Sequence, residues 1–338
     1  MLSFTLKVPV DFEDSFRLDQ YIAFAKPEMN RSKLKSCAQS ILLNGKEAKL
    51  SAKIKPNDVI DVFWDENIPE NIEPEHIPLK IIYEDENVTI VNKKQGMVTH
   101  PAAGNWSGTL VNALLFHWGK EAVPQLKEGR ENEILQKRRP GIVHRLDKDT
   151  SGVIVTAKNR ETEEYLGYQF KERLIQKEYL CIVVGRPPAS SGDIKTQIIR
   201  DPKNRQRFKA VDTTVTADGK FARSIYHCVA CFGNYSIVRV RIKTGRTHQI
   251  RVHMKYLGCP IVGDKIYGRQ DALFPNATLM LHSRQMILRL PNENTYRCFK
   301  ASIPERFFDV LHILKKTYPK ETLPKVCKKC KTYRKTYQ

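Results

Sequence analysis

Acidic residues are comparatively few in this sequence and long apolar runs are missing, and both shortages limit what the protein can be. Its 338 residues include 57 Lys and Arg but only 37 Asp and Glu, a formal net charge of +20. Such an excess attracts polyanions, of which nucleic acid is the commonest. Apolar runs such as Leu180–Val184 are far too short to span a bilayer. We therefore expect a nucleic-acid partner and no membrane.

Signals for export and for a disulfide framework are also missing. The segment Met1–Val10 lacks a charged start followed by an apolar stretch, so secretion is not expected. The eight cysteines are scattered along a long chain instead of being packed into a small framework. Reduced thiols in a cytoplasm are the simplest interpretation. No internal repeat of fixed period is visible.

Residues 14–64 have the pattern of a compact basic module. Apolar residues near helical spacing predict one helix after Phe16 and a second over Leu34–Leu42. A turn at Asn44-Gly45 and a strand over Val59–Phe63 follow. Between residues 31 and 55 there are seven basic residues and one acidic residue.

The rest of the chain divides into three parts. Residues 65–80 have no periodicity and read as a linker. Residues 81–314 contain many irregular strands with inserted helices, which favours an α+β fold with a mixed or antiparallel sheet. Residues 315–338 form a basic tail, expected to bind nucleic acid or simply to be solvated. The predicted strands are 88–92, 141–144, 153–157, 179–184 and 235–242, and the predicted helices are 161–175 and 247–257.

The densest polar cluster is His144–Gly152, which lies between two apolar runs. A polar turn joining two buried strands presents its side chains at the edge of a sheet, where functional groups are often held. Arg145 and Lys148 flank Asp147 and Asp149, and a carboxylate near fixed cations stays ionised, as a nucleophile requires. An ordinary charged turn would look the same, so these residues alone leave both interpretations open.

A second cluster is Thr244–His253. Thr247 fits the N-cap of a helix, and His248, Arg251 and Lys255 then lie three and four residues apart on one face. That face could meet a carboxylate or a phosphate, or it could be solvated.

Two further segments give weaker signals. Tyr179 opens a strand in Lys177–Tyr179 and could stack on a base, although a tyrosine in this position more often packs at the edge of a core. The segment His100–Gly104 could shape a substrate rim or only a turn.

Two pairs of cysteines have the C-x-x-C form of zinc ligands. Cys228 and Cys231 lie in a predicted strand, where residues three apart point to opposite faces. Cys327 and Cys330 lie in the tail, about ninety residues away. We therefore expect no structural zinc.

Taken together, six segments in order resemble the RluA family of pseudouridine synthases over residues 81–304. The segments are Lys93–Gly104 with Gly108–Leu115, His144–Gly152, Lys177–Tyr179, Thr244–His253, Gly263–Gly268 and His282–Pro291. The strings His144–Gly152 and Gly245–His253 are the most specific of them.

Residues 16–64 resemble an S4 RNA-binding module. The matching pieces are Arg17-Leu-Asp19, Arg31-Ser32, Leu43–Lys46 and the strand entry at Lys55–Val62. Asn30 stands where Ser is more usual, a small departure from the pattern.

The resemblance implies the pseudouridine synthase fold, a mixed and largely antiparallel sheet with flanking helices around a central RNA cleft. A small α/β S4-like domain would precede it. The family pattern makes Asp147 the catalytic carboxylate and Arg145 the residue that fills the space left by a flipped nucleotide. It makes Tyr179 the aromatic that packs on the target base and Arg251 the cation that pairs with the catalytic carboxylate. The family requires no cofactor and no metal.

The basic segments are then expected to bind the RNA. Arg31, Lys33 and Lys46 would contact it from the S4-like module, and Arg246 and His248 would contact it from the second cluster. The stretch Arg200–Lys209, with five basic residues, would add phosphate contacts.

The reaction implied is the isomerisation of uridine to pseudouridine, which breaks the bond from ribose C1′ to N1 and rebonds C1′ to C5. Asp147 would assist by attacking C1′ or by removing a ribose proton, and the sequence does not choose between them. Large-subunit ribosomal RNA is the expected substrate, with transfer RNA as the alternative. A non-catalytic S4-type RNA-binding protein is a further alternative. We expect a cytoplasmic monomer.

Overall fold

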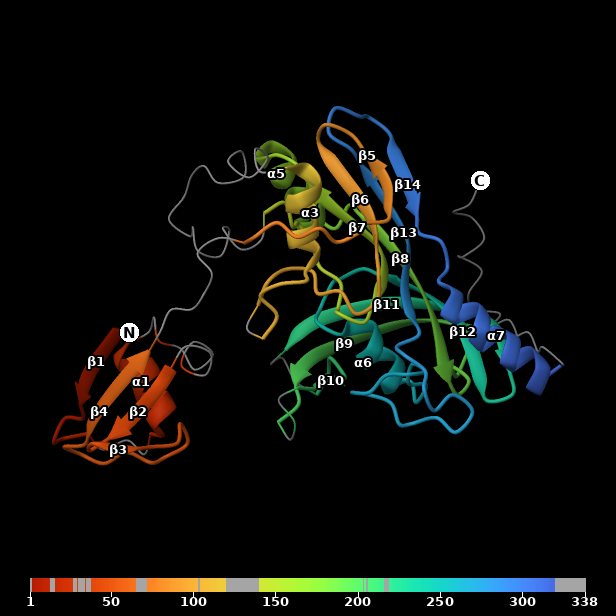
Figure 1. The fold of residues 1–338 in the computed structure, drawn as a ribbon. Helices are drawn as coiled ribbons and strands as arrows, with labels where there is room; N and C mark the ends of the chain where they lie inside the picture. Colours follow the sequence, from red (N-terminus) through yellow and green to blue (C-terminus); the bar gives the residue numbers. More distant parts are fainter. Residues whose placement is uncertain are drawn as a thin grey trace. The chain divides into compact units, whose positions relative to one another are not determined.

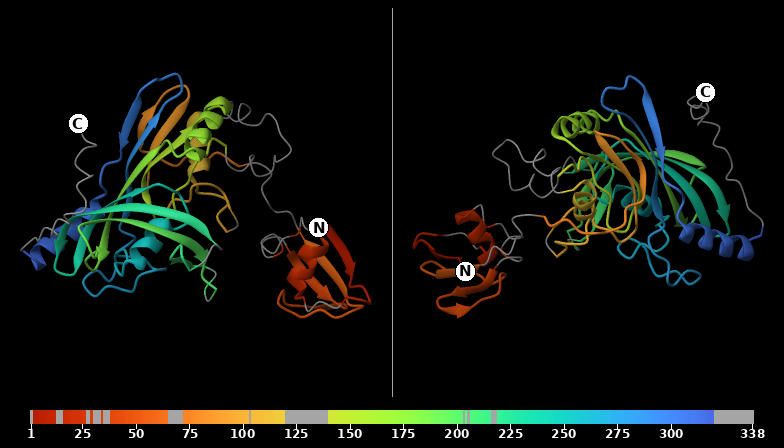
Figure 2. Two further views of the ribbon diagram at one scale, coloured as in Figure 1. Left: turned by 180° about the vertical axis from the view of Figure 1, so that it is seen from behind. Right: turned by 45° about the horizontal axis from the view of Figure 1, so that its top comes forward.

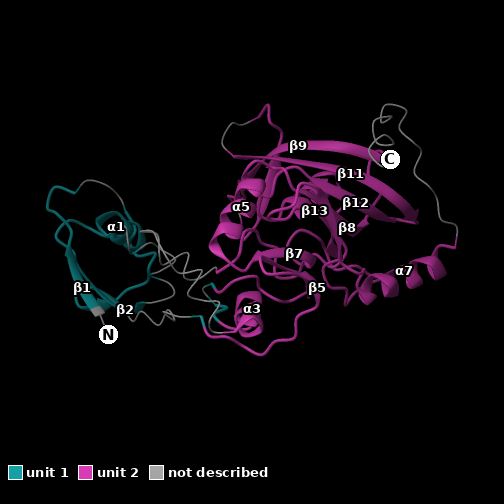
Figure 3. Ribbon diagram, turned by 90° about the horizontal axis from the view of Figure 1, so that it is seen from above, with its two compact units in different colours: residues 1–72, 102–106 teal, residues 73–101, 107–338 magenta. Residues whose placement is uncertain are grey.

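The computed structural model describes residues 2–12, 16–26, 29, 34, 38–64, 72–102, 104–119, 140–202, 204, 206–215 and 219–319. The chain forms two compact units, shown in different colours in Figure 3. Unit 1 consists of Met1–Ile72 with Ala102–Trp106, and unit 2 consists of Glu73–Pro101 with Ser107–Gln338.

Unit 1 contains helix α1 (Leu18–Ala25) and an antiparallel sheet of four short strands. In spatial order the strands are β1 (Leu2–Lys7), β4 (Val59–Trp64), β2 (Ala38–Leu43) and β3 (Lys46–Glu47). Leu18 and Ile22 of the helix are fully buried with Ile60 and Val62 of the sheet. Strand β1 precedes residues 14–64, so the sheet extends beyond the expected module.

The second helix expected over Leu34–Leu42 is wrong for most of its length. Residues 38–43 form β2, in which Ile41 pairs with Val62 of β4 and is buried. Three or four apolar residues at helical spacing are a weak signal, and pairing with a neighbouring strand overrides it.

Unit 2 is built on one sheet of ten strands. Along the sheet the order is β10-β9-β11-β12-β8-β13-β7-β6-β5, and β14 also pairs with β13. Every pairing is antiparallel except that of β13 with β7, so the predicted α+β fold with a mixed, largely antiparallel sheet is confirmed. The strands are β5 (Ile81–Glu84), β6 (Val88–Lys93), β7 (Ser151–Ala157), β8 (Gln176–Val184), β9 (Ser191–Arg200), β10 (Phe208–Val211), β11 (Lys220–Phe232), β12 (Tyr235–Ile242), β13 (Leu281–Arg289) and β14 (Tyr296–Lys300).

Within the described residues, four helices flank this sheet: α3 (Leu110–Trp118), α5 (Arg160–Lys171), α6 (Gln249–Tyr256) and α7 (Glu305–Thr317). Figures 1 and 2 show β5, β6 and β14 running steeply across the direction of β9, β11 and β12, because the sheet twists along its width. Helix α6 packs against β10 and β11, and α5 packs against β7. Helix α7 continues past residue 314, and residues 320–338 of the predicted tail lie outside the described ranges.

Strand β7 is buried along its whole length. Val153 and Val155 face one apolar cluster with Leu166 of α5, whereas Ile154 faces another cluster with Leu114 of α3. A strand covered on both faces is rigid, so the loop that enters it has a fixed end.

Two expected boundaries in unit 2 are wrong. Residues 141–144 form no strand beyond one bridge from Ile142 to Thr156, since the His144 imidazole accepts the hydrogen bond from Val155 N at 3.1 Å. The helix expected over residues 161–175 ends at Lys171, and Arg173 then adopts a left-handed φ of 59°.

The segment expected to be a linker is only partly described. Residues 73–80 have no regular structure, but Ile77 and Leu79 pack against the core of unit 2. Among the described residues, no helix is long and apolar enough to cross a bilayer.

Candidate active site

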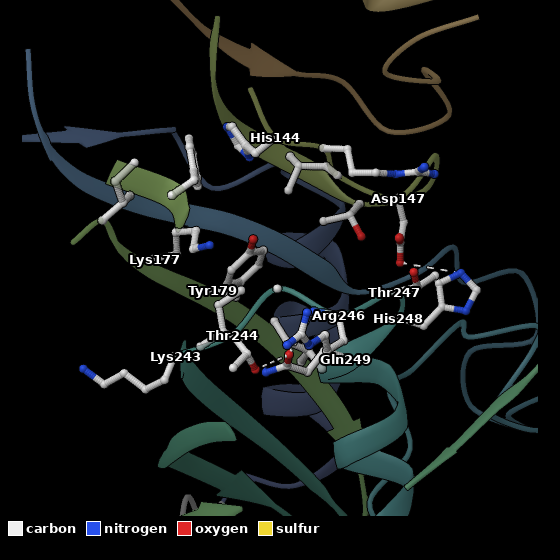
Figure 4. A pocket seen from close by; sticks show the side chains of 18 of the residues that line it. His144, Asp147, Lys177, Tyr179, Lys243, Thr244, Arg246, Thr247, His248 and Gln249 are labelled. Carbon is white, nitrogen blue, oxygen red and sulfur yellow. Dashed lines mark hydrogen bonds and ion pairs between the residues drawn. The ribbon is translucent and has the colours of Figure 1, made fainter. Parts of the chain in front are cut away.

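A cavity of about 440 Å³ opens where the loop before β7, the start of β8 and the start of α6 meet (Figure 4). It brings together all six site residues that the sequence predicted in unit 2. These are Arg145, Asp147, Tyr179, Arg246, His248 and Arg251. Of the other predicted residues, Lys46 is exposed in unit 1, and Arg31 and Lys33 lie outside the described residues.

Asp147 lies in a tight turn, in which Thr150 N donates to the Asp147 carbonyl at 3.0 Å. Contacts from residues 93–99 hold this turn from behind. Thr99 Oγ1 donates to the Leu146 carbonyl at 3.0 Å, and Gly96 N donates to the Lys148 carbonyl at 2.9 Å. Residues 93–99 therefore support the Asp147 loop, whereas the expectation that His100–Gly104 shapes a substrate rim or a turn stays a prediction.

Lys93 is the centre of that support and is fully buried. Its Nζ donates to the carbonyls of Met97, Lys94 and Lys148 at 2.8, 3.1 and 3.2 Å. Burial lowers the pKa of Lys93 to about 7, although the charges of Asp147 and Asp149 act in the opposite direction. One ammonium thus ties two loops together beneath the turn.

The far end of the turn is fixed by Gly152. A β-carbon there would stand 2.1 Å from the Ser283 carbonyl oxygen of β13, and the φ angle is +115°. Only glycine permits this close approach. It allows β13 to pair in parallel with β7 through Ser151 and Gly152.

Arg251 of α6 links Asp147 to a second carboxylate. Its Nη1 lies 3.4 Å from Asp147 Oδ2, and its Nε and Nη2 each donate to Asp264 at 2.8 Å. Asp264 also accepts from the backbone N–H groups of Ile266 and Tyr267. The guanidinium is therefore oriented by a bidentate pair, and its free edge faces Asp147.

The pKa values of this pair reflect their contacts. Burial alone would raise the pKa of Asp264, but the hydrogen bonds and charge of Arg251 outweigh it and the pKa is lowered. Burial alone would lower the pKa of Arg251, but Asp264 and then Asp147 raise it. Both groups are thus charged at neutral pH.

The start of α6 differs from the prediction. The helix begins at Gln249, and its N-cap is His248 in the left-handed region at φ 55°, not Thr247. The buried Gln249 side chain accepts from Thr244 Oγ1 at 2.7 Å and from Arg246 N at 3.0 Å. These bonds hold the loop in the place of a side-chain cap, and they turn His248 toward the cavity.

His248 contacts both Asp147 and Tyr267. Its Nε2 lies 3.9 Å from Asp147 Oδ2, and its Nδ1 lies 2.9 Å from the Tyr267 hydroxyl. The Tyr267 hydroxyl accepts a hydrogen bond from Phe208 N, so we assign its own proton to a hydrogen bond donated to His248 Nδ1. The His248 ring then carries its proton on Nε2. Burial lowers the pKa of His248, with a smaller contribution from Arg251, while Asp147 acts to raise it.

Tyr179 lies on β8 with its side chain buried at the cavity wall. Burial raises the pKa of its hydroxyl, and the negative charge of Asp147 raises it further. The phenol is therefore neutral and stands near the carboxylate. A neutral ring at this position can serve as a surface for a flat ligand.

The cavity is strongly basic. Among the described residues, the lining includes seven basic side chains and a single carboxylate, that of Asp147. The basic residues are Arg145, Lys171, Arg173, Lys177, Lys243, Arg246 and Arg251. Such a lining attracts a polyanion.

Sequence reasoning missed Lys93, Asp264 and Gln249 as individual contributors. All three lie inside the strings that carried the family resemblance, and that position was the one sign in the sequence that they could belong to the site. Their roles depend on burial and on partners distant in the chain, so residue type alone could not assign them.

The argument about Cys228 and Cys231 needs correction. A bulge between Cys228 and Ala230 shifts the register of β11, and the two Sγ atoms lie 3.5 Å apart, not on opposite faces. Within the described ranges, no group of three His, Cys, Asp or Glu residues is arranged to hold a metal. Cys327 and Cys330 lie outside those ranges, and the expectation of no zinc stays a prediction.

Residues 87–256, which include most of the cavity lining, match the family model described as RNA pseudouridylate synthase. The chain therefore belongs to the RNA pseudouridylate synthase family, and the predicted class of enzyme, an isomerase acting on uridine in RNA, is confirmed.

Relatives from distant bacteria span nearly the same length. "Ribosomal large subunit pseudouridine synthase D" of Borreliella burgdorferi is 40% identical over 305 residues, which cover 87% of this chain and 88% of that protein. An "Uncharacterized RNA pseudouridine synthase" of Aquifex aeolicus is 37% identical over 330 residues, which cover 94% and 99%. The structure of "Human RNA Pseudouridylate Synthase Domain Containing 4" matches with a TM-score of 0.52 at 23% identity, covering 72% of this chain and 94% of that one, a likeness of fold alone.

Proposed function

We propose that this protein isomerises specific uridines in large-subunit ribosomal RNA, with Asp147 as the catalytic carboxylate. One observation carries the assignment of the residue: Asp147 is the single carboxylate lining a basic cavity, and it lies against Arg251. The names of relatives at about 40% identity support the ribosomal substrate.

The target uridine must leave its stack to reach Asp147, which costs a few kcal/mol. Tyr179 offers a surface on which the extruded uracil can stack, and Arg145, exposed at the cavity rim, can occupy the space that the nucleotide leaves. Arg251, which lies 3.4 Å from Asp147 Oδ2, would hold that carboxylate toward ribose C1′. Asp147 then assists cleavage of the glycosidic bond, by attack on C1′ or by removal of a ribose proton.

Contacts outside the cavity would position the RNA. Arg246 and His248 border the cavity, and the β9–β10 hairpin approaches it through Phe208, whose ring lies 5.8 Å from that of His248. Lys46, Arg31 and Lys33 of the S4-like module would bind phosphates of the same RNA. We further propose that the enzyme acts as a cytoplasmic monomer without metal or cofactor.

The test is to map pseudouridine in cellular RNA by carbodiimide chemistry, with and without the gene. Ribosomal RNA of the deletion strain should lose pseudouridine at one or a few positions. Wild-type protein should restore them and Asp147→Asn should not. Restoration by Asp147→Asn would refute the catalytic assignment, and loss confined to transfer RNA would refute the ribosomal substrate. An unchanged map would favour a non-catalytic RNA-binding role.

A further inference from the structure

Lys177 is a cavity cation that has neither a hydrogen-bond acceptor nor a counter-ion among the described residues. It lies on β8 two residues before Tyr179, so the two side chains share one face of the strand. The side chain is partly buried, and its Nζ lies 5.1 Å from the centre of the Phe170 ring. No hydrogen bond or ion pair from the described part of the chain reaches this ammonium.

The other cations of the cavity differ from it. Arg251 is paired with Asp264 and Asp147, and Arg246 Nε donates to the Phe221 carbonyl at 3.0 Å. The remaining ones are exposed, so water solvates their charges: Arg145, Lys171, Arg173 and Lys243. Lys177 alone among the lining cations is both withdrawn from water and without an acceptor.

Holding an unpaired ammonium out of water is unfavourable. Burial lowers the pKa of Lys177 to about 8, which still leaves it mostly charged at neutral pH. A cation kept at this cost beside a cavity is suited to an acceptor that the ligand brings.

The arrangement in the cavity indicates which part of the ligand Lys177 meets. In Figure 4 the Lys177 ammonium points toward the Tyr179 ring from the side opposite Asp147. Under the proposed function, the ribose lies at Asp147 and the uracil stacks on Tyr179. The edge of the base that is remote from the sugar then faces Lys177, and that edge carries a carbonyl oxygen.

We propose that Lys177 is a further catalytic residue, which donates a hydrogen bond to a carbonyl oxygen of the target uracil and stabilises negative charge on the detached base. The proposal rests on the proposed function. When the C1′–N1 bond breaks, its electron pair stays on the uracil and is shared between N1 and the two carbonyl oxygens. C1′ is meanwhile bonded to Asp147 or stabilised by loss of a ribose proton.

The charge disappears when the base turns and C5 bonds to C1′. In that step the uracil supplies the electron pair, and either the bond from C1′ to Asp147 breaks or Asp147 returns the ribose proton. The proton on C5 then leaves and N1 gains a proton. Lys177 keeps its own proton throughout, so the overall reaction remains an isomerisation. Its contribution is electrostatic and greatest while the base is detached.

The test uses single-turnover kinetics of the full-length protein on a transcript of the ribosomal RNA region that loses pseudouridine in the deletion strain. The variants are Lys177→Met and Lys177→Arg, with Lys300→Met as a matched control at an exposed lysine outside the cavity lining. Each is measured on the uridine transcript and on a transcript with 5-fluorouridine at the target. Fluorine withdraws electrons and makes the uracil a better leaving group.

At saturating enzyme, Lys177→Met should break the glycosidic bond of the target uridine about 100-fold more slowly than wild type, a typical loss for one such donor. On 5-fluorouridine the loss should shrink to about tenfold, because the better leaving group needs the cation less. Lys177→Arg should recover part of the rate and Lys300→Met all of it. The dissociation constant for RNA should change little.

Other results would overturn the proposal. Equal losses on both transcripts would indicate a structural role, and weaker RNA binding with an unchanged rate would indicate a phosphate contact. Asp147→Asn is run in parallel. If wild type converts no transcript, the proposed function fails; if wild type and Asp147→Asn behave as expected but Lys177→Met keeps the full rate, only this inference fails. Lys177→Arg, with the charge retained, keeps the test valid should Lys177→Met misfold.

Discussion

At the scale of single residues, Asp264 orients the cation that faces Asp147. It is fully buried and binds one edge of the Arg251 guanidinium through Nε and Nη2, which leaves Nη1 directed at Asp147. Breaking such a pair leaves a buried charge without its main partner.

Asp264→Asn should therefore lower the free energy of unfolding by about 3 kcal/mol and reduce activity. Urea denaturation of the full-length protein measures the stability change. Asp193→Asn is the matched control, because its pair with Arg223 is partly exposed and contributes only about 0–1 kcal/mol. Similar losses in the two variants would contradict the role given to Asp264.

The residues of the site were predictable to different degrees. Asp147 and Arg251 could be named because each lies inside a specific string, and Tyr179 could be named from its place in the ordered set of matching segments. The structure brings all three to one cavity. The N-cap could not be predicted correctly, since His248 occupies a left-handed conformation that usually favours glycine or asparagine. Only the side-chain bonds of Gln249 explain it.

At the scale of elements, the Asp147 loop depends on two neighbours that hold its backbone. Lys93 fastens it to residues 94–97, and β7 anchors its far end. The depressed pKa of Lys93 makes this support sensitive to pH.

The sign follows from linkage. Lys93 has a pKa of about 7 when folded, against an ordinary value of 10.5. The stability linked to it is fully present above about 10.5 and is lost as the pH falls through about 7. Between pH 7 and 9, the unfolding free energy of wild type should rise relative to that of Lys93→Met by about 1.4 kcal/mol per pH unit. Urea denaturation at pH 7, 8 and 9 measures both proteins. A constant difference would mean that Lys93 keeps its proton in the folded protein over this pH range, so that burial does not lower its pKa.

Errors in the expected elements have a common physical origin. Residues 38–43 have helical spacing of apolar residues, but they form a strand that pairs with β4. Residues 141–144 have the pattern of a strand, but the His144 side chain accepts the hydrogen bond from Val155 N that a neighbouring strand would otherwise accept. The bulge that brings Cys228 beside Cys231 is likewise invisible in the sequence. Each depends on contacts between distant segments, which local patterns do not encode. The strands 153–157 and 235–242 were predictable because residues 153–155 are a continuous apolar run and residues 238–242 alternate between apolar and basic residues.

At the scale of the whole molecule, the net charge of +20 governs how RNA is approached. Phosphate contacts release counterions, so RNA affinity should fall steeply with salt. This term acts on any RNA, whereas the cavity acts on the single uridine that enters it.

Lys46 tests the contribution of unit 1, whose identity as an S4-like module remains a prediction. Lys46→Glu should weaken binding of the target transcript and reduce the slope of log affinity against log salt by about one contact. Filter binding at several salt concentrations measures this. Lys300→Glu makes the same charge change at an exposed lysine outside the cavity lining. Equal slopes for the two variants would argue against an RNA contact at Lys46.

The parallel pairing of β7 with β13 also has a consequence for protein synthesis. Ser151 and His282, which share a hydrogen bond, are 131 residues apart. At ordinary translation rates, the ribosome needs on the order of ten seconds to extend the nascent chain from one to the other. Strand β7, which follows the Asp147 turn, therefore lacks its partner β13 while the intervening residues are synthesised. All four strands of unit 1 lie within the first 64 residues and are complete long before.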